Sequence, residues 1–136
     1  MKPVLTACGL ALALAACAPR REARPPLADL DAYKRIVALD ILQHAPGAYC
    51  HPGEEMLKSV VILEIAIDAE GRLLGAAVVR SNGHPELDKV ALDTVTGAAP
   101  FAPPAPDLVN GSASVRFLES FLFREDECFQ IRSLVY

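Results

Sequence analysis

The chain has 136 residues, of which 52% are hydrophobic, and a formal net charge of −4. From Leu27 onward, nine Lys and Arg residues face sixteen Asp and Glu residues, so this part has a net charge of −7. Contact with phosphates needs a basic surface, so the acidic balance argues against nucleic-acid binding. The length allows one domain with a modest core.

The N-terminus carries a short apolar run over residues 4–16. As a helix, thirteen residues would reach roughly 20 Å, whereas a bilayer core is about 30 Å thick. Such a length is typical of a signal peptide, and Leu14-Ala15-Ala16-Cys17 resembles the lipobox of bacterial lipoproteins. We therefore predict a lipoprotein signal peptide (residues 1–16), acylation of Cys17, and a Pro- and Arg-rich tether (residues 17–28).

Residues around the predicted cleavage site suggest where the anchored protein would lie. Acylation at Cys17 implies insertion of fatty chains into a membrane, at roughly 0.8 kcal/mol per buried methylene. In lipoproteins an aspartate after the cysteine favours the inner membrane, and here Ala18 follows. The expected location is the periplasmic face of the outer membrane. The alternative is an ordinary signal peptide cleaved after Ala16 or Ala18.

Two further cysteines, Cys50 and Cys128, lie in the mature part of the chain. In an oxidising compartment we expect them to form a disulfide, and closing so long a loop would contribute about 4 kcal/mol. A metal site is the competing interpretation, because His44 and His51 lie near Cys50 and are followed by two acidic residues, Glu54 and Glu55. These ligands lack a zinc-type spacing. His44 also falls on an apolar helical stripe, so it is predicted to pack at a core margin.

Hydrophobic periodicity predicts the first elements. A helix is expected over residues 30–44, with Asp29 as its N-cap and Ala45-Pro46-Gly47 ending it. The segments 60–67 and 73–79 read as the strands of a hairpin around the turn 68–71.

The second half begins with a helix at Pro85 that ends near Gly97. Its expected inner face comprises Leu87, Val90, Ala91 and Val95. The segment "APFAPPAPD" (residues 99–107) is predicted to be an extended connector, because proline lacks the N–H that helices and sheets require. A strand over 112–123 follows, with a short fourth strand possible in the last nine residues.

These elements predict an α+β fold in the order α-β-β-α-β. A small antiparallel sheet of three to four strands packs with two helices, and the domain spans residues 29–136.

Short motifs in this segment resemble the C-terminal domains of the TonB and TolA family. Members typically show an Asp-x-x-Gly turn, a Ser-x-Gly turn, a Leu-Asp-x-x-Ala-Leu helix and a proline-rich segment. The corresponding residues are Asp68 and Gly71, Ser81 and Gly83, Leu87-Asp88 with Ala91-Leu92, and Pro100 to Pro106. The resemblance covers about residues 57 to 124.

The resemblance implies a periplasmic, non-enzymatic domain that pairs its last strand with an extended peptide from a partner. The implied partners are envelope proteins, either an outer-membrane transporter or a Tol-type protein, with no cofactor and no small-molecule substrate. Candidate positions on that strand are Ser114, Arg116, Leu118, Ser120 and Leu122. Alternatively, the C-terminal tail covers this edge, because exposed edges invite aggregation.

The motif residues have structural explanations. Gly83 permits the positive φ of a strand-to-helix turn, Leu87 anchors the helix on the sheet, and Asp88 favours the positive end of the helix. A hydrolytic triad of Ser81, His84 and Asp88 is the competing interpretation. Turn and helix-cap chemistry is the commoner explanation, so no catalysis is expected.

Two other functions stay open at this point. Energy transducers of the family have an N-terminal transmembrane helix and a long spacer, where this chain has a lipobox and about ten residues. The protein could still be a transducer if its N-terminus is retained. It could also be a structural lipoprotein that braces an envelope complex.

Overall fold

The computed structural model describes residues 29–50 and 56–135. The predicted signal peptide, Cys17 and the tether lie outside the described residues, as do His51, Glu54 and Glu55.

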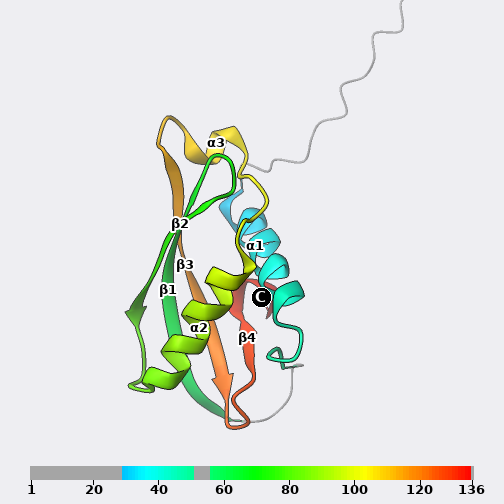
Figure 1. Ribbon diagram of the computed structural model, residues 1–136, viewed down its shortest axis with the longest axis vertical. Coiled ribbons are helices and arrows are strands. Elements are labelled where there is room, and N and C mark those ends of the chain that lie inside the picture. Colours follow the sequence, from blue (N-terminus) through cyan, green and yellow to red (C-terminus); the bar gives the residue numbers. More distant parts are fainter. Residues whose placement is uncertain (1–28, 51–55, 136) are drawn as a thin grey trace, which may run out of the picture.

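The described chain forms an α+β domain whose four strands make one antiparallel sheet (Figure 1). Its elements are α1 (Leu30–His44), β1 (Leu57–Asp68), β2 (Leu73–Arg80), α2 (Pro85–Ala98), α3 (Pro106–Val109), β3 (Ser114–Arg124), β4 (Phe129–Ile131) and α4 (Arg132–Val135). The strand order is β2-β1-β3-β4. The predicted fold class and the order α-β-β-α-β are confirmed.

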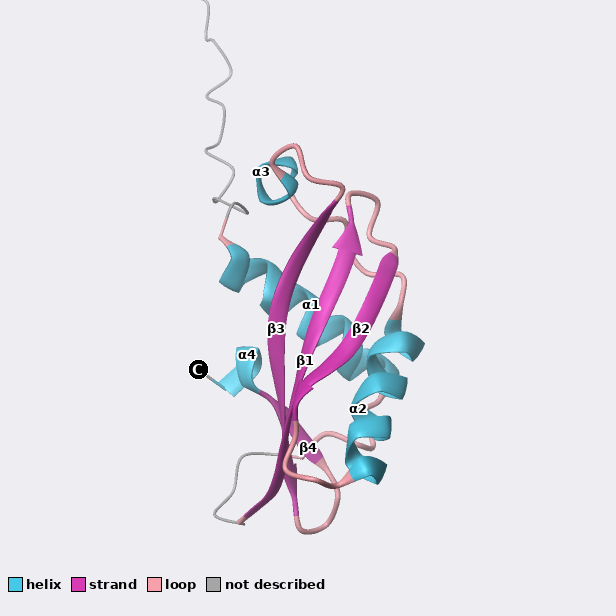
Figure 2. Cartoon of the chain, turned by 90° about the vertical axis from the view of Figure 1, so that its left-hand side faces the viewer, coloured by secondary structure: helices cyan, strands magenta, loops and turns pink. Residues whose placement is uncertain are grey.

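Helices α1 and α2 cover one face of the sheet, and Figure 2 shows the other face of β1, β2 and β3 without a helix in front of it. Alternating residues of the two central strands make the covered face apolar. These residues are Val61, Leu63, Ile65 and Ile67 in β1, and Val115, Phe117, Phe121 and Phe123 in β3. They form one core with the inner faces of the helices.

Helix α1 begins where expected, because the Asp29 side chain accepts a hydrogen bond from the N–H of Asp31 at 3.0 Å. Its central stripe, from Tyr33 to Ile41, is buried. The prediction that His44 packs at a core margin is wrong. This residue is exposed, since the last turn extends beyond the core, and its Nδ1 lies 2.8 Å from the carbonyl oxygen of Asp40.

Helix α2 starts at Pro85 and buries Leu87, Ala91 and Val95, which are spaced four residues apart. Val90 was predicted on the same face but is 38% exposed, because it lies at the margin of this stripe. The helix continues through Gly97 to Ala98.

The proline-rich connector is extended over residues 99–105, but its end differs from the prediction, because residues 106–109 form the short helix α3. Helix α1 holds the extended part through two bonds at Ala102. The hydroxyl of Tyr33 donates to the Ala102 carbonyl at 2.8 Å, and the Ala102 N–H donates to Oδ2 of Asp40 at 3.2 Å. Burial, together with the charges of Asp40 and Asp68, raises the pKa of Tyr33 to about 12, so this phenol remains a donor at physiological pH.

The C-terminal segment closes the lower end of the core. Strand β4 pairs with β3 on one side and forms a bridge to Tyr49 on the other. Cys50 and Cys128 are joined by a disulfide whose Cα atoms are 5.3 Å apart. The segment before β1 and the β3–β4 turn are therefore covalently connected.

Candidate functional site

The edge of β3 is divided into a covered part and an open part. On one side β3 pairs with β1 along its whole length. On the other side β4 pairs only with Phe121, Leu122 and Phe123. Within the described residues no strand pairs with this side of β3 from Ser114 to Ser120. The tail thus covers only one end of the edge.

The direction of the backbone groups follows from the ladder. In an antiparallel sheet, alternate residues direct both their N–H and their C=O to the same neighbour. The N–H of Arg124 donates to the carbonyl of Cys128 at 2.9 Å, on the side of β4. The β1–β3 register shifts between Leu57 and Ser59, where the extra residue lies in β1, so the alternation along β3 is uninterrupted from Arg124 to Ser114. The even-numbered residues of β3 therefore direct their backbone groups to this edge.

The five candidate strand residues all lie on the open face, opposite the buried odd-numbered positions of β3. Arg116 and Leu118 are exposed, and Nη1 of Arg116 lies 3.2 Å from Oε1 of Glu64 on β1. Ser114, Ser120 and Leu122 are half-buried. Leu122 is paired with Gln130 of β4, so its backbone does not belong to the open part of the edge.

The opposite edge of the sheet, β2, is less regular. The β1–β2 register shifts between Ile62 and Leu63 and again between Ala66 and Ile67, whereas β1 and β3 pair without a shift over the same residues. Such bulges twist an edge and discourage a further strand from pairing with it. The open part of β3 is thus the better template for strand addition.

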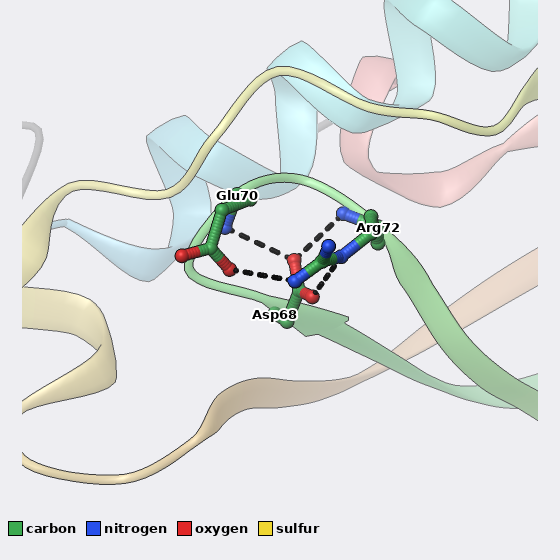
Figure 3. Close-up of polar contacts among 3 residues, drawn as sticks. All are labelled: Asp68, Glu70 and Arg72. Carbon is green, nitrogen blue, oxygen red and sulfur yellow. Dashed lines mark hydrogen bonds and ion pairs between the residues drawn. The ribbon is translucent and has the colours of Figure 1, made fainter.

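The hairpin motif at Asp68 stabilises the turn between β1 and β2 (Figure 3). Its Oδ1 accepts the N–H groups of Glu70 and Arg72 at 3.0 and 2.8 Å, and Nε of Arg72 donates to Oδ2 at 2.7 Å. The Arg72 guanidinium also contacts the Glu70 carboxylate at 3.3 Å. These contacts complete the turn and give Asp68 a structural role.

Stability should depend on pH through this turn. The Arg72 side-chain hydrogen bond, supported by the backbone N–H groups, lowers the pKa of Asp68 from 3.8. A lowered carboxyl pKa stabilises the fold above the unfolded-state value, and the contribution disappears as pH falls through the folded-state value. We expect Asp68→Asn to be less stable than the native chain at pH 7 and to converge with it in acid. Urea unfolding of both proteins from pH 7 to pH 2 measures this; a gap that stays constant would contradict it.

The second motif joins a turn to a helix. The hydroxyl of Ser81 donates to Oδ2 of Asp88 at 3.0 Å and accepts the N–H of Gly83 at 3.2 Å. Gly83 has φ +86°, which its lack of a side chain permits. His84 faces Glu86, with Nδ1 and Oε1 3.4 Å apart. Ser81 therefore bonds to the acid directly, and the serine–histidine–aspartate chain that a triad needs is not formed.

The metal site considered in the sequence analysis would need Cys50 as a thiolate ligand. The sulfur of Cys50 is bonded to that of Cys128, so neither can act as a thiolate in this state. Asp126 lies near both sulfurs, but it does not change this conclusion.

Among the described residues, no helix combines the length and the apolar character that crossing a membrane requires.

A comparison with protein families matches residues 54–119 to the Gram-negative bacterial TonB protein C-terminal domain. Residues 54–119 thus form a TonB C-terminal-like domain. The match includes β1, β2, α2 and α3 and ends within β3, at Glu119. No curated protein and no solved structure matches the chain.

Domains of the TonB C-terminal family are periplasmic and non-enzymatic, and they interact with envelope proteins such as outer-membrane transporters. The matched segment contains the Asp68 and Ser81 motifs described above. Helix α1, strand β4 and helix α4 lie outside it. The open part of β3 thus lies in the family segment from Ser114 to Glu119, and the tail that covers the end of β3 lies outside it.

Proposed function

We propose that this protein is a lipid-anchored periplasmic module that binds an extended segment of an envelope protein along the open edge of β3. The observation that supports this most directly is the regular, unpaired edge from Ser114 to Ser120. Main-chain hydrogen bonds would supply affinity, and alternate side chains would supply selectivity.

The side chains beside the open edge favour a partly apolar segment. On the open face Leu118 is 50% exposed, next to the Arg116–Glu64 ion pair. On the covered face Val115 and Phe117 are buried in the core, where the Phe117 ring contacts Tyr33 of α1, and both would continue the core beneath an added strand. An incoming segment with apolar residues on both faces would bury surface against both rows.

The anchor in this proposal is acylated Cys17, at the periplasmic face of the outer membrane. Anchoring by fatty chains holds a domain near its neighbours but cannot transmit force as a packed transmembrane helix can. We therefore favour an interaction module over an energy transducer. Incorporation of radioactive palmitate that Cys17→Ala abolishes would support the anchor; retention of the uncleaved N-terminus would favour the transducer.

Photo-crosslinking in cells tests the binding edge. The full chain carries p-benzoylphenylalanine at Leu118 in β3 or, as a matched control, at Val79 in β2, where the native side chains are 50% and 58% exposed. We expect an adduct with an envelope protein from position 118 and none from position 79. Adducts from 79 alone would assign binding to the other edge. The absence of adducts from both positions would favour a purely structural lipoprotein.

A further inference from the structure

Glu119 is an acidic residue on the covered face of β3. It alternates with Phe117 and Phe121 and is only 2% exposed. Burying a carboxylate is costly unless hydrogen bonds compensate it. Its partners therefore indicate why this position tolerates glutamate.

The Glu119 carboxylate joins β3 to the C-terminal helix. Its Oε1 accepts the N–H of Ser120 at 3.0 Å and that of Ser133 at 3.4 Å. Its Oε2 accepts the hydroxyl of Ser133 in α4. Helix α4 follows β4 directly and lies beside the edge of β3 in Figure 2. We call this set of contacts the Glu119 clasp.

In the Glu119 clasp, a backbone N–H group on the open edge is already hydrogen-bonded. Ser120 is an even-numbered residue of β3, so its N–H points to the side where a peptide would add. Because Glu119 already accepts this N–H, a peptide that paired at Ser120 would have to displace the carboxylate. Beyond Ser120 the edge is occupied by β4.

We propose that Glu119 is a positioning residue that ends the peptide-binding edge at Leu118; this inference rests on the proposed function. The available edge then comprises Ser114 to Leu118, with three edge-directed residues. It accommodates an extended segment of about five residues, or about 16 Å. Longer pairing requires release of the clasp and of α4.

A crosslinking scan tests where the edge ends. In cells that express the full chain, p-benzoylphenylalanine replaces one even-numbered β3 residue at a time: Ser114, Arg116, Leu118, Ser120 or Leu122. We expect partner adducts at positions 114 to 118 and at most a tenth of that yield at 120 and 122. In a Glu119→Leu background, the yield at position 120 should rise at least fivefold.

Matched variants separate the clasp from a general effect on folding. Glu119→Gln keeps an oxygen that can accept the Ser120 N–H, so the adduct pattern should stay native. Ser133→Ala releases α4 but leaves the bond to Ser120, so position 120 should stay at background. Amide hydrogen exchange of the free full-length chain provides a readout without a partner. The Ser120 amide should exchange at least tenfold faster in Glu119→Leu than in Glu119→Gln.

The outcomes distinguish this inference from the proposed function. Equal adduct yields at positions 118 and 120 in the native chain would overturn the positioning role while supporting the binding edge. An unchanged Ser120 exchange rate in Glu119→Leu would also overturn it, whether or not a partner is captured. No adduct at any of the five positions would refute the proposed function itself.

Discussion

Replacing Gly71 with alanine is expected to destabilise the domain by roughly 3–5 kcal/mol, a large part of the 5–15 kcal/mol that typical domains have. Gly71 lies at the hairpin turn with φ +89°, a conformation that costs an L-residue about 1–2 kcal/mol. A Cβ at this position would also lie 2.1 Å from the carbonyl oxygen of Phe101. Both effects act at the same residue.

The neighbouring contacts explain why this clash is difficult to relieve. The N–H of Phe101 donates to the Gly71 carbonyl at 2.8 Å, which holds the connector against the turn. Phe101 is itself buried in the core, and helix α1 holds the next residue, Ala102. To admit a methyl group, the connector would have to move away from all these contacts.

Other glycines supply matched controls for the Gly71→Ala prediction. Gly83 has a similar φ of +86° but open space around a Cβ, so Gly83→Ala should cost only about 1–2 kcal/mol. Gly75 lies in β2 with open space and no positive φ, so Gly75→Ala should change stability by about 0.5 kcal/mol or less. Urea unfolding at pH 7 measures all three. A loss for Gly71→Ala no larger than that for Gly83→Ala would contradict the proposed clash.

Local sequence chemistry predicted the regular elements of this fold. The N-cap at Asp29, the Asp68 turn and Pro85 at the start of α2 mark boundaries that the structure confirms. Alternation of apolar residues placed the core face of β1. These features depend on residues close in the chain, so a single sequence contains them.

The ends of helices were harder to predict, because they depend on how far the core extends. His44 continues the stripe of α1 by spacing but lies beyond the core, and Val90 lies at the margin of the α2 stripe. Helices α3 and α4 have four residues each, too few for a periodic pattern to identify. Tertiary contacts decide such positions.

The candidate site was predicted only in part. Resemblance indicated the strand, and alternation indicated which side chains face outward. Neither shows where β4 stops pairing. Alternation also places Glu119 on the covered face, but its partner Ser133 is fourteen residues away, in a segment where a short strand was expected and the helix α4 forms. The boundary of the open edge therefore required the fold.

Loss of the Cys50–Cys128 disulfide should destabilise the domain by about as much as the Gly71→Ala substitution. The two cysteines are 78 residues apart in sequence, and closing such a loop restricts the unfolded chain by about 4 kcal/mol. The folded contacts nearby are mainly between backbone groups: the N–H of Cys50 donates to the Phe129 carbonyl at 2.9 Å, and the N–H of Phe129 donates to Ala48 at 2.8 Å. Cys50→Ala/Cys128→Ala should keep these bonds but lower the free energy of unfolding by roughly 3–5 kcal/mol.

Reduction provides the matched experiment, because it removes the bond without changing the sequence. Dithiothreitol should lower the urea midpoint of the native chain to about that of the double alanine variant, and it should leave the variant's own midpoint unchanged. The disulfide connects the turn before β4 to the segment before β1, so amides of β4 should lose protection in both cases. If the native chain unfolds at the same urea concentration with and without reductant, the cross-link does not stabilise this domain. The covered end of β3 would then depend on hydrogen bonding and on core packing, which includes the ring contacts of Phe129 with Phe121 and Phe123.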